Sequence, residues 1–292
     1  MDQRRRWEPA AVIEPFPSTI RRGYLDAELC GEFAQLHFRS CGREEAPLVL
    51  LLHQTPSSSA MYQNLMPLLA RDFFVLAIDT PGFGNSDPLP ATFPGGISIA
   101  GFADAIYRAV SSKFDRPALV FGHHTGAAIA VQLAFDQPAF VRALALSGPT
   151  LLTDEQKAAL PLAAQTIAAD AEGAHWQRMW QRLRAKDPQA ELSLSQREAL
   201  LAFTCGDYYE ASYRAVVEQD VVPQLAAIQC PTLVFAGGRD LLRAAVEPTV
   251  QLLPKGRAAE LPEDAGTYVC DRQPAAVAEL LQPFFLEIVR AG

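Results

Sequence analysis

Several residue types are scarce or scattered in this chain of 292 residues, and each scarcity argues against a class of protein. The five cysteines form no Cys-x-x-Cys pair, which indicates buried thiols of a reducing compartment rather than disulfides or a zinc site. Basic residues are outnumbered, with a net charge of −8, and their longest run is Arg4-Arg5-Arg6, so no nucleic-acid surface is expected. No apolar run approaches the roughly 20 residues of a transmembrane helix, and the polar N-terminus does not resemble a signal peptide. We therefore expect a cytoplasmic protein that binds neither nucleic acid nor a membrane.

The residues that are abundant predict a large α/β core. Hydrophobic residues make up 49% of the chain, enough for a sizeable core. Buried or pleated strand patterns alternate with helical patterns, which implies a mostly parallel, doubly wound sheet with helices on both faces. The predicted strands lie at 19–28, 31–38, 46–56, 73–87 (ending in a glycine-rich loop), 118–121, 142–149, 230–240 and 257–264, and the predicted helices at 58–70, 98–113, after 125 and from about 274.

One long segment interrupts this alternation. Residues 150–227 carry helical patterns rich in Ala, Gln, Arg and Leu, without a convincing strand. We predict that they form a helical cap inserted into a core made of residues 1–149 and 228–292. Ligands of such sheets bind beyond the carboxyl ends of the strands, where this insertion would act as a lid. An ordinary helical subdomain without a lid role is the alternative.

The stretch FGHHTGAAIA, residues 121–130, has the pattern of a sharp turn from a strand into a helix. Such a turn lifts its middle residue above the edge of the sheet, and the residue presented there is most often a serine nucleophile. Here the middle residue is His124.

Four motifs, in order and spacing, resemble the α/β-hydrolase family along nearly the whole chain. LLHQTP (51–56) is similar to the oxyanion loop, and DTPGFGNSD (79–87) to the Asp-x-x-Gly-x-Gly-x-Ser-Asp loop. GHHTG (122–126) occupies the place of the Gly-x-Ser-x-Gly elbow, and PTLVFAGGRD (231–240) resembles the strand that ends in the catalytic acid, here Asp240. The resemblance implies an α/β-hydrolase fold.

The chain departs from the family pattern at the residues that matter for chemistry. His124 stands at the serine position, Thr267 at the position of the catalytic histidine, and Gln54 where glycine is usual in the oxyanion loop. No histidine follows Asp240 in any register, so the order Ser…Asp…His cannot be completed. A serine acyl-enzyme needs both a hydroxyl and a base, and we therefore do not expect serine-hydrolase chemistry.

The two departures at His124 and Thr267 are complementary. An imidazole at the elbow is longer than serine and could meet Asp240 directly, which leaves its other nitrogen as a general base. By position in the family, the backbone N–H groups of Thr55 and Thr125 would form the oxyanion hole, to which Gln54 could add an amide or which it could fill. The hypothesis is a cofactor-independent enzyme acting on a small apolar or cyclic substrate, by hydrolysis of an ester, lactone or C–C bond or by lyase or isomerase chemistry. The alternative is a non-catalytic ligand-binding or scaffold relative.

Further residues are possible substrate contacts. These are Gln54 and His123 near the elbow, and Trp176 and Tyr209 in the helical segment, although such aromatic residues at helical spacing also serve simple packing. No metal site is predicted, because adjacent histidines point apart and no third ligand has suitable spacing. The sequence leaves the oligomeric state open.

Overall fold

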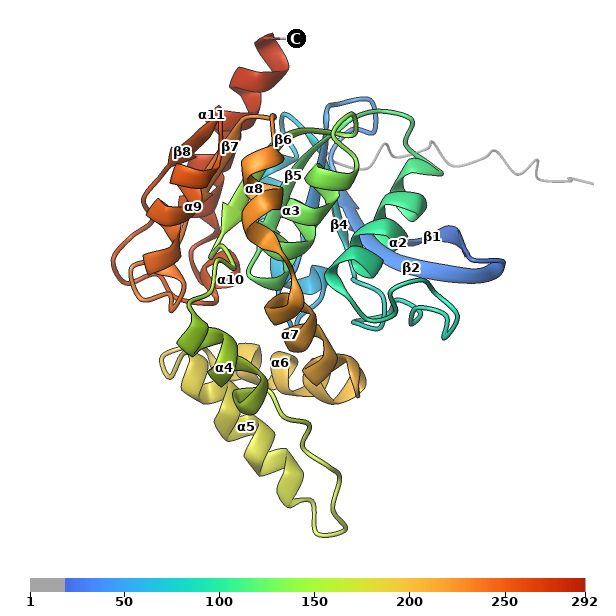
Figure 1. Ribbon diagram of the computed structural model, residues 1–292, viewed down its shortest axis with the longest axis vertical. Helices are drawn as coiled ribbons and strands as arrows, with labels where there is room; N and C mark the ends of the chain where they lie inside the picture. Colours follow the sequence, from blue (N-terminus) through green and yellow to red (C-terminus); the bar gives the residue numbers. More distant parts are fainter. Residues whose placement is uncertain (1–18, 292) are drawn as a thin grey trace, which may run out of the picture.

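The computed structural model describes residues 19–291, so the basic run Arg4-Arg5-Arg6 lies outside the described residues. The described chain has one sheet of eight strands in the order β1-β2-β4-β3-β5-β6-β7-β8 (Figure 1). The first two strands pair antiparallel, β2 also pairs antiparallel with β4, and the remaining pairs are parallel. The mostly parallel, doubly wound sheet is therefore confirmed. The strands are β1 (Arg21–Leu29), β2 (Glu32–Cys41), β3 (Leu48–Leu52), β4 (Phe74–Ile78), β5 (Ala118–His123), β6 (Val141–Ser147), β7 (Thr232–Phe235) and β8 (Gly256–Ala258).

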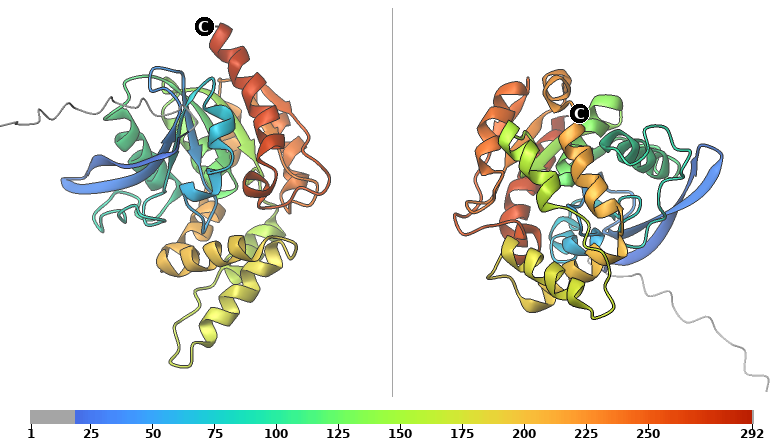
Figure 2. Two further views of the ribbon diagram at one scale, coloured as in Figure 1. Left: turned by 180° about the vertical axis from the view of Figure 1, so that it is seen from behind. Right: turned by 60° about the horizontal axis from the view of Figure 1, so that its bottom comes forward.

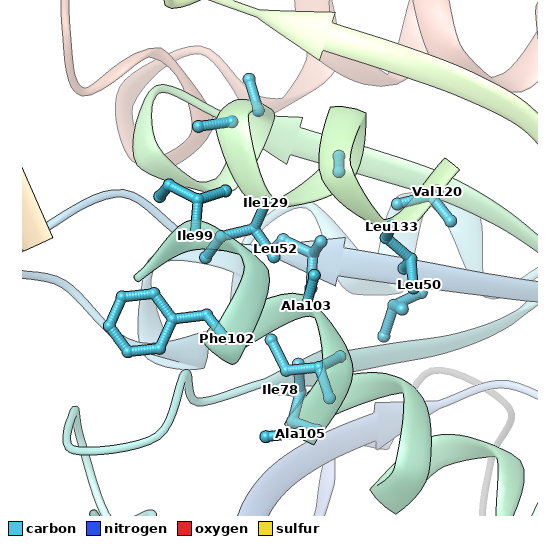
Figure 3. Close-up of a cluster of buried hydrophobic side chains, with 14 of the residues drawn as sticks. Leu50, Leu52, Ile78, Ile99, Phe102, Ala103, Ala105, Val120, Ile129 and Leu133 are labelled. Carbon is cyan, nitrogen blue, oxygen red and sulfur yellow. The ribbon is translucent and has the colours of Figure 1, made fainter. Parts of the chain in front are cut away.

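Helices cover both faces of the sheet because the central strands are apolar on both sides. Successive side chains of a strand point to opposite faces, so Leu50 and Leu52 of β3 pack on one side, and Val49 and Leu51 on the other. Figure 3 shows the first face, where strand residues meet α2 (Ile99–Ser111) and α3 (Thr125–Asp136). The second face is covered by α1 (Met66–Leu69), α10 (Val269–Arg272) and α11 (Pro274–Ala291). The short elements η1 (Ser59–Tyr62), η2 (Arg243–Ala245) and α9 (Val246–Leu252) complete the core.

Residues 150–227 form a helical insertion between β6 and β7. Its helices are α4 (Asp154–Ala163), α5 (Ala174–Lys186), α6 (Leu192–Thr204), α7 (Tyr208–Glu218) and α8 (Val221–Ala227). Helices α4, α5 and α6 lie beyond one end of the sheet, and α8 returns alongside α3 (Figures 1 and 2). The Gln224 amide of α8 donates a hydrogen bond to Gln132 of α3 at 2.7 Å, which joins the end of the insertion to the core.

Three sequence expectations differ from the structure. The helix predicted at 58–70 is broken into η1 and α1, since Pro67 lacks an N–H and would clash with a preceding helical carbonyl. The strand predicted at 257–264 is reduced to the three residues of β8, because its partner β7 is only four residues long and pairs with it from Thr232 to Val234. Cys30, expected as a buried thiol, is exposed in the β1–β2 turn. Among the described residues no helix is long and apolar enough to cross a membrane.

Candidate active site

The turn between β5 and α3 places His124 at its apex in a strained conformation. His124 has φ 51° and ψ −114°, values that non-glycine residues rarely adopt and that cost about 1–3 kcal/mol. Its N–H donates to the Ser147 carbonyl at 2.9 Å and its own carbonyl accepts from Ala127 at 2.7 Å. A Cβ atom on Gly126 would lie 1.9 Å from the Leu52 carbonyl oxygen, so the close approach of helix and strand requires glycine there. The sequence pattern at 121–130 thus produces the expected sharp turn.

The imidazole of His124 meets the carboxylate of Asp240, as expected from the sequence. Nε2 of His124 lies 2.7 Å from Oδ2 of Asp240, whose side chain is buried after β7, while the His124 side chain is 18% exposed. Burial opposes the charge of Asp240. The charge and hydrogen bond of His124 nevertheless hold the pKa of this carboxyl well below its usual range, with help from His123 and the Leu242 N–H.

An ionised carboxylate only accepts hydrogen bonds, so Nε2 of His124 carries the proton in this pair. In a neutral ring Nδ1 is then unprotonated, and it has no hydrogen-bond partner among residues 19–291. Serine would carry its hydroxyl oxygen on Cβ, whereas histidine carries Cγ there, so Nδ1 lies one bond beyond that position. The residue at the elbow therefore has one ring nitrogen bonded to Asp240 and one without a partner among the described residues.

Gly148, directly after β6, makes room for the imidazole to reach Asp240. Its φ is +61°, and a Cβ atom there would lie 2.4 Å from Cδ2 and 2.6 Å from Nε2 of His124. The same atom would be 3.4 Å from Oδ2 of Asp240. Sequence reasoning did not single out Gly148, although a glycine directly after a buried strand next to the elbow was a usable signal.

His123, predicted as a possible substrate contact although a buried role was the alternative, lies in the core with both ring nitrogens engaged. It is fully buried, with Nε2 donating to the Thr267 carbonyl at 2.8 Å and Nδ1 2.9 Å from the Ser147 hydroxyl. Burial, together with the nearby charge of His124, lowers the pKa of His123 to about 3. Thr267, predicted to stand at the catalytic-histidine position, thus uses its main chain to hold His123.

The two predicted oxyanion-hole residues lie next to each other, but one donor is already in use. The Thr55 N–H points at the Thr125 hydroxyl, with 3.4 Å between nitrogen and oxygen, a long and therefore weak hydrogen bond. The Thr125 N–H lies in the first turn of α3, where no helical partner exists, and no described residue accepts it. An oxyanion could thus use Thr125 directly and Thr55 after its hydrogen bond opens.

The loop after β3 is held by His53. Its Nδ1 donates to the Gln54 carbonyl at 2.9 Å, and its Nε2 accepts from the Thr80 N–H at 2.9 Å, which fixes a neutral tautomer. Burial lowers the pKa of His53, consistent with that neutral state. Gln54 is also buried in this loop.

The helical insertion contacts the loop after β3 through residues of α7. Tyr213 of α7 donates to the Thr55 carbonyl at 3.2 Å, and the hydroxyl groups of Ser212 and Thr55 lie 3.0 Å apart. Trp176 and Tyr209 line a pocket of about 320 Å³ within the insertion itself, and neither His124 nor Asp240 lines it. The structure therefore does not bring Trp176 to the elbow.

Sequence reasoning missed a buried ionic group where the insertion meets the core. Glu198 of α6 is fully buried, and its Oε1 accepts from Ser57 at 3.0 Å and from Arg197 at 2.7 and 2.9 Å. Arg197 also donates to both carboxylate oxygens of Asp271 in α10, at 2.7 and 2.8 Å. Adjacent Arg and Glu residues on a helix usually indicate a solvated face, so no sequence signal marked them. Among the described residues, no group of three or more His, Cys, Asp or Glu side chains could hold a metal ion.

Known proteins resemble this chain in sequence and in fold. A fluoroacetate dehalogenase from a Burkholderia species is 28% identical over 275 residues, covering 84% of this chain and 89% of that protein. A haloalkane dehalogenase from Bradyrhizobium diazoefficiens is 33% identical over 136 residues, covering 46% of this chain and 40% of that protein. In this dehalogenase and in three further curated relatives, the region that matches this chain covers only 17% to 40% of the relative's own length.

The fold agrees with solved hydrolase structures, and a family model matches most of the chain. A thermophilic esterase from Thermogutta terrifontis superposes with a TM-score of 0.75 at 20% identity, covering 92% of this chain and 99% of the esterase chain. The model described as the alpha/beta hydrolase fold matches residues 47–269, which include the elbow and the strand before Asp240. The chain therefore belongs to the α/β-hydrolase fold family.

Proposed function

We propose that this protein is a cofactor-independent hydrolase in which His124 is a general base instead of a serine nucleophile. The observation that carries the proposal is the 2.7 Å contact between Nε2 of His124 and Asp240, which leaves Nδ1 bare at the apex of the turn. The relatives include proteins named as dehalogenases and an esterase, so a hydrolytic reaction fits the family.

The proposed step begins with water bound to Nδ1 of His124. Nδ1 takes one proton from the water while the oxygen attacks the substrate carbonyl, and the imidazolium that forms is stabilised by Asp240. The developing oxyanion accepts hydrogen bonds from the Thr125 N–H and, once its bond to the Thr125 hydroxyl opens, from Thr55. Nδ1 then returns its proton to the leaving group, so the enzyme ends in its starting state.

The helical insertion is proposed to act as a cap over this reaction. Its contacts with Thr55 and Ser57 put α6 and α7 against the loop that supplies one oxyanion donor. Small esters and lactones, apolar or cyclic, are the substrates that this arrangement favours, with C–C bond hydrolysis and proton abstraction as related reactions of the same base. One observation favours the non-catalytic alternative: the Thr125 hydroxyl occupies the Thr55 N–H, so half of the oxyanion site is filled.

A hydrolysis screen of small esters and lactones tests the proposal. Removal of a general base should lower the rate by about 10²–10⁴, so His124→Ala is expected to lose activity by that factor. His175→Ala is the matched control, because His175 is a partly buried histidine of the insertion, paired with Asp170 rather than with the elbow. Its activity should equal that of the wild type.

Other outcomes of the same screen would contradict the proposal. Equal turnover by wild type and His124→Ala would exclude the base. A fluorophosphonate label on any serine would indicate a serine enzyme, and a trapped acyl group on His124 would make it the nucleophile. A protein without turnover across the panel that still binds these compounds would be the non-catalytic relative.

A further inference from the structure

The ionic group between insertion and core contains one negative charge more than its cation can balance. The Glu198 side chain is fully buried and the Asp271 side chain is 8% exposed, and the guanidinium of Arg197 bonds to both carboxylates. Asp271 uses its two oxygens for Arg197, and Oε1 of Glu198 accepts three hydrogen bonds. When both carboxylates are ionised, the group therefore carries a net charge of −1.

Two polar atoms in this region have no hydrogen-bond partner among the described residues. They are Oε2 of Glu198 and the hydroxyl of Tyr268, whose residues are 0% and 1% exposed. Folded proteins pair nearly all buried polar atoms, so two such atoms where the insertion meets the core require an explanation. Tyr268 packs in one buried cluster with Leu194, which lies one helical turn before Glu198 in α6. Burial and then the negative charge of Glu198 raise the pKa of Tyr268.

Both atoms belong to segments that adjoin the candidate base. Ser57, which donates to Glu198, lies two residues after Thr55 in the loop beside the elbow. Tyr268 follows Thr267, whose carbonyl holds His123, the neighbour of His124. The charge of Glu198 also acts on Tyr213, which donates to Thr55.

We propose that Glu198 and Tyr268 form the polar end of the substrate site and bind a hydrogen-bond donor of the substrate, a protonated amine or a hydroxyl. The inference rests on the proposed function, because it assigns this site to the substrate. A donor would satisfy Oε2 of Glu198, and the Tyr268 oxygen can accept from the same group. Because the ionic group carries excess negative charge, a protonated amine binds more tightly than a hydroxyl.

Three probes that share a benzene ring test this order of affinities: benzylamine, benzyl alcohol and toluene. Each is titrated into the intact protein near neutral pH, and binding is followed by NMR. A hydrogen bond to a charged group corresponds to about tenfold to hundredfold in affinity, so benzylamine is expected to bind at least about tenfold more tightly than toluene. Benzyl alcohol should fall between them.

Variants then assign the preference to the two residues. Glu198→Gln should remove most of the benzylamine preference while it retains the side-chain shape. Tyr268→Phe deletes a hydroxyl that has no bond to a described residue, so it should fold normally and weaken both polar probes by about twofold to tenfold. The matched controls are Glu210→Gln, a partly exposed insertion glutamate bonded to Thr166 and Arg214, and Tyr208→Phe, whose hydroxyl bonds to Leu89. Both controls should bind the probes in the wild-type order.

The binding-site proposal and the catalytic proposal can fail independently, because the three probes report binding and are not substrates. His124→Ala should keep the binding order even though it loses turnover. The inference is wrong if wild type binds the three probes equally or not at all, or if Tyr268→Phe and a folded Glu198→Gln retain wild-type affinities. A retained order in a protein whose turnover does not depend on His124 would support the binding site and reject the base.

Discussion

Substitution of Gly148 by alanine should break the contact between His124 and Asp240 without touching either residue. The added methyl group would lie 2.4 Å from Cδ2 and 2.6 Å from Nε2 of His124, well inside van der Waals distance. The imidazole must move, because the other neighbour is the buried Asp240 carboxylate at 3.4 Å. The rate should therefore fall towards that of His124→Ala.

The free energy of unfolding should fall by two separable amounts. Alanine at a φ of +61° costs about 1–2 kcal/mol relative to glycine. The lost hydrogen bond to a charged carboxylate costs about 1.5–3 kcal/mol more. Gly96→Ala is the control for the first amount, since Gly96 has a φ of +54° and no atom within 4 Å of an added Cβ.

A double-mutant cycle measured by urea unfolding isolates the steric part. In the His124→Ala background the imidazole is absent, so Gly148→Ala should cost only the backbone amount seen with Gly96→Ala. The coupling energy between Gly148 and His124 should then be about 1.5–3 kcal/mol. If Gly148→Ala costs the same in both backgrounds and retains full activity, the imidazole does not depend on this clearance and the reasoning is refuted.

Two further predictions concern pH. His123 has a folded-state pKa of about 3, so below its unfolded value of about 6.5 only the unfolded chain takes up the proton. The free energy of unfolding, measured by urea titration, should fall by up to about 1.4 kcal/mol per pH unit as the pH drops from 6 to 4. In a folded His123→Gln variant the fall per pH unit should be smaller by this amount. Asp79 accepts from His37, the Ser59 N–H and the Asn85 N–H, which lower its pKa to about 2 against the opposing effect of burial. The ionised Asp79 should therefore contribute about 2 kcal/mol to the free energy of unfolding, in full above about pH 4 and progressively less towards pH 2. Asp79→Asn should be less stable than the wild type at pH 7, and the difference in stability should shrink on acidification. A difference in stability that does not change with pH would contradict this prediction.

The sequence predicted the parts of the site that depend on local pattern. The turn at His124 follows from a buried strand, close-approach glycines and a helical run, all within ten residues. Asp240 was predicted because PTLVFAGGRD (231–240) resembles the family strand that ends in the catalytic acid. The length of an imidazole then made the contact between them an expectation from geometry.

The remaining parts depend on side-chain orientation and distant packing. The burial of Glu198 arises because α6 meets Ser57 and Arg197 bridges to Asp271, which no helical pattern encodes. Trp176 has helical spacing, but spacing alone does not say which face of α5 meets the core. The Thr125 hydroxyl competes for the Thr55 N–H through its rotamer, which is a tertiary choice.

The paired histidines of the elbow have a consequence for how protons travel. The ring centroids of His123 and His124 lie 4.3 Å apart, so the two imidazoles are direct neighbours. His123, however, has both nitrogens engaged in the interior and resists a second proton. Protons should therefore reach and leave His124 through its own Nδ1 and not by way of His123.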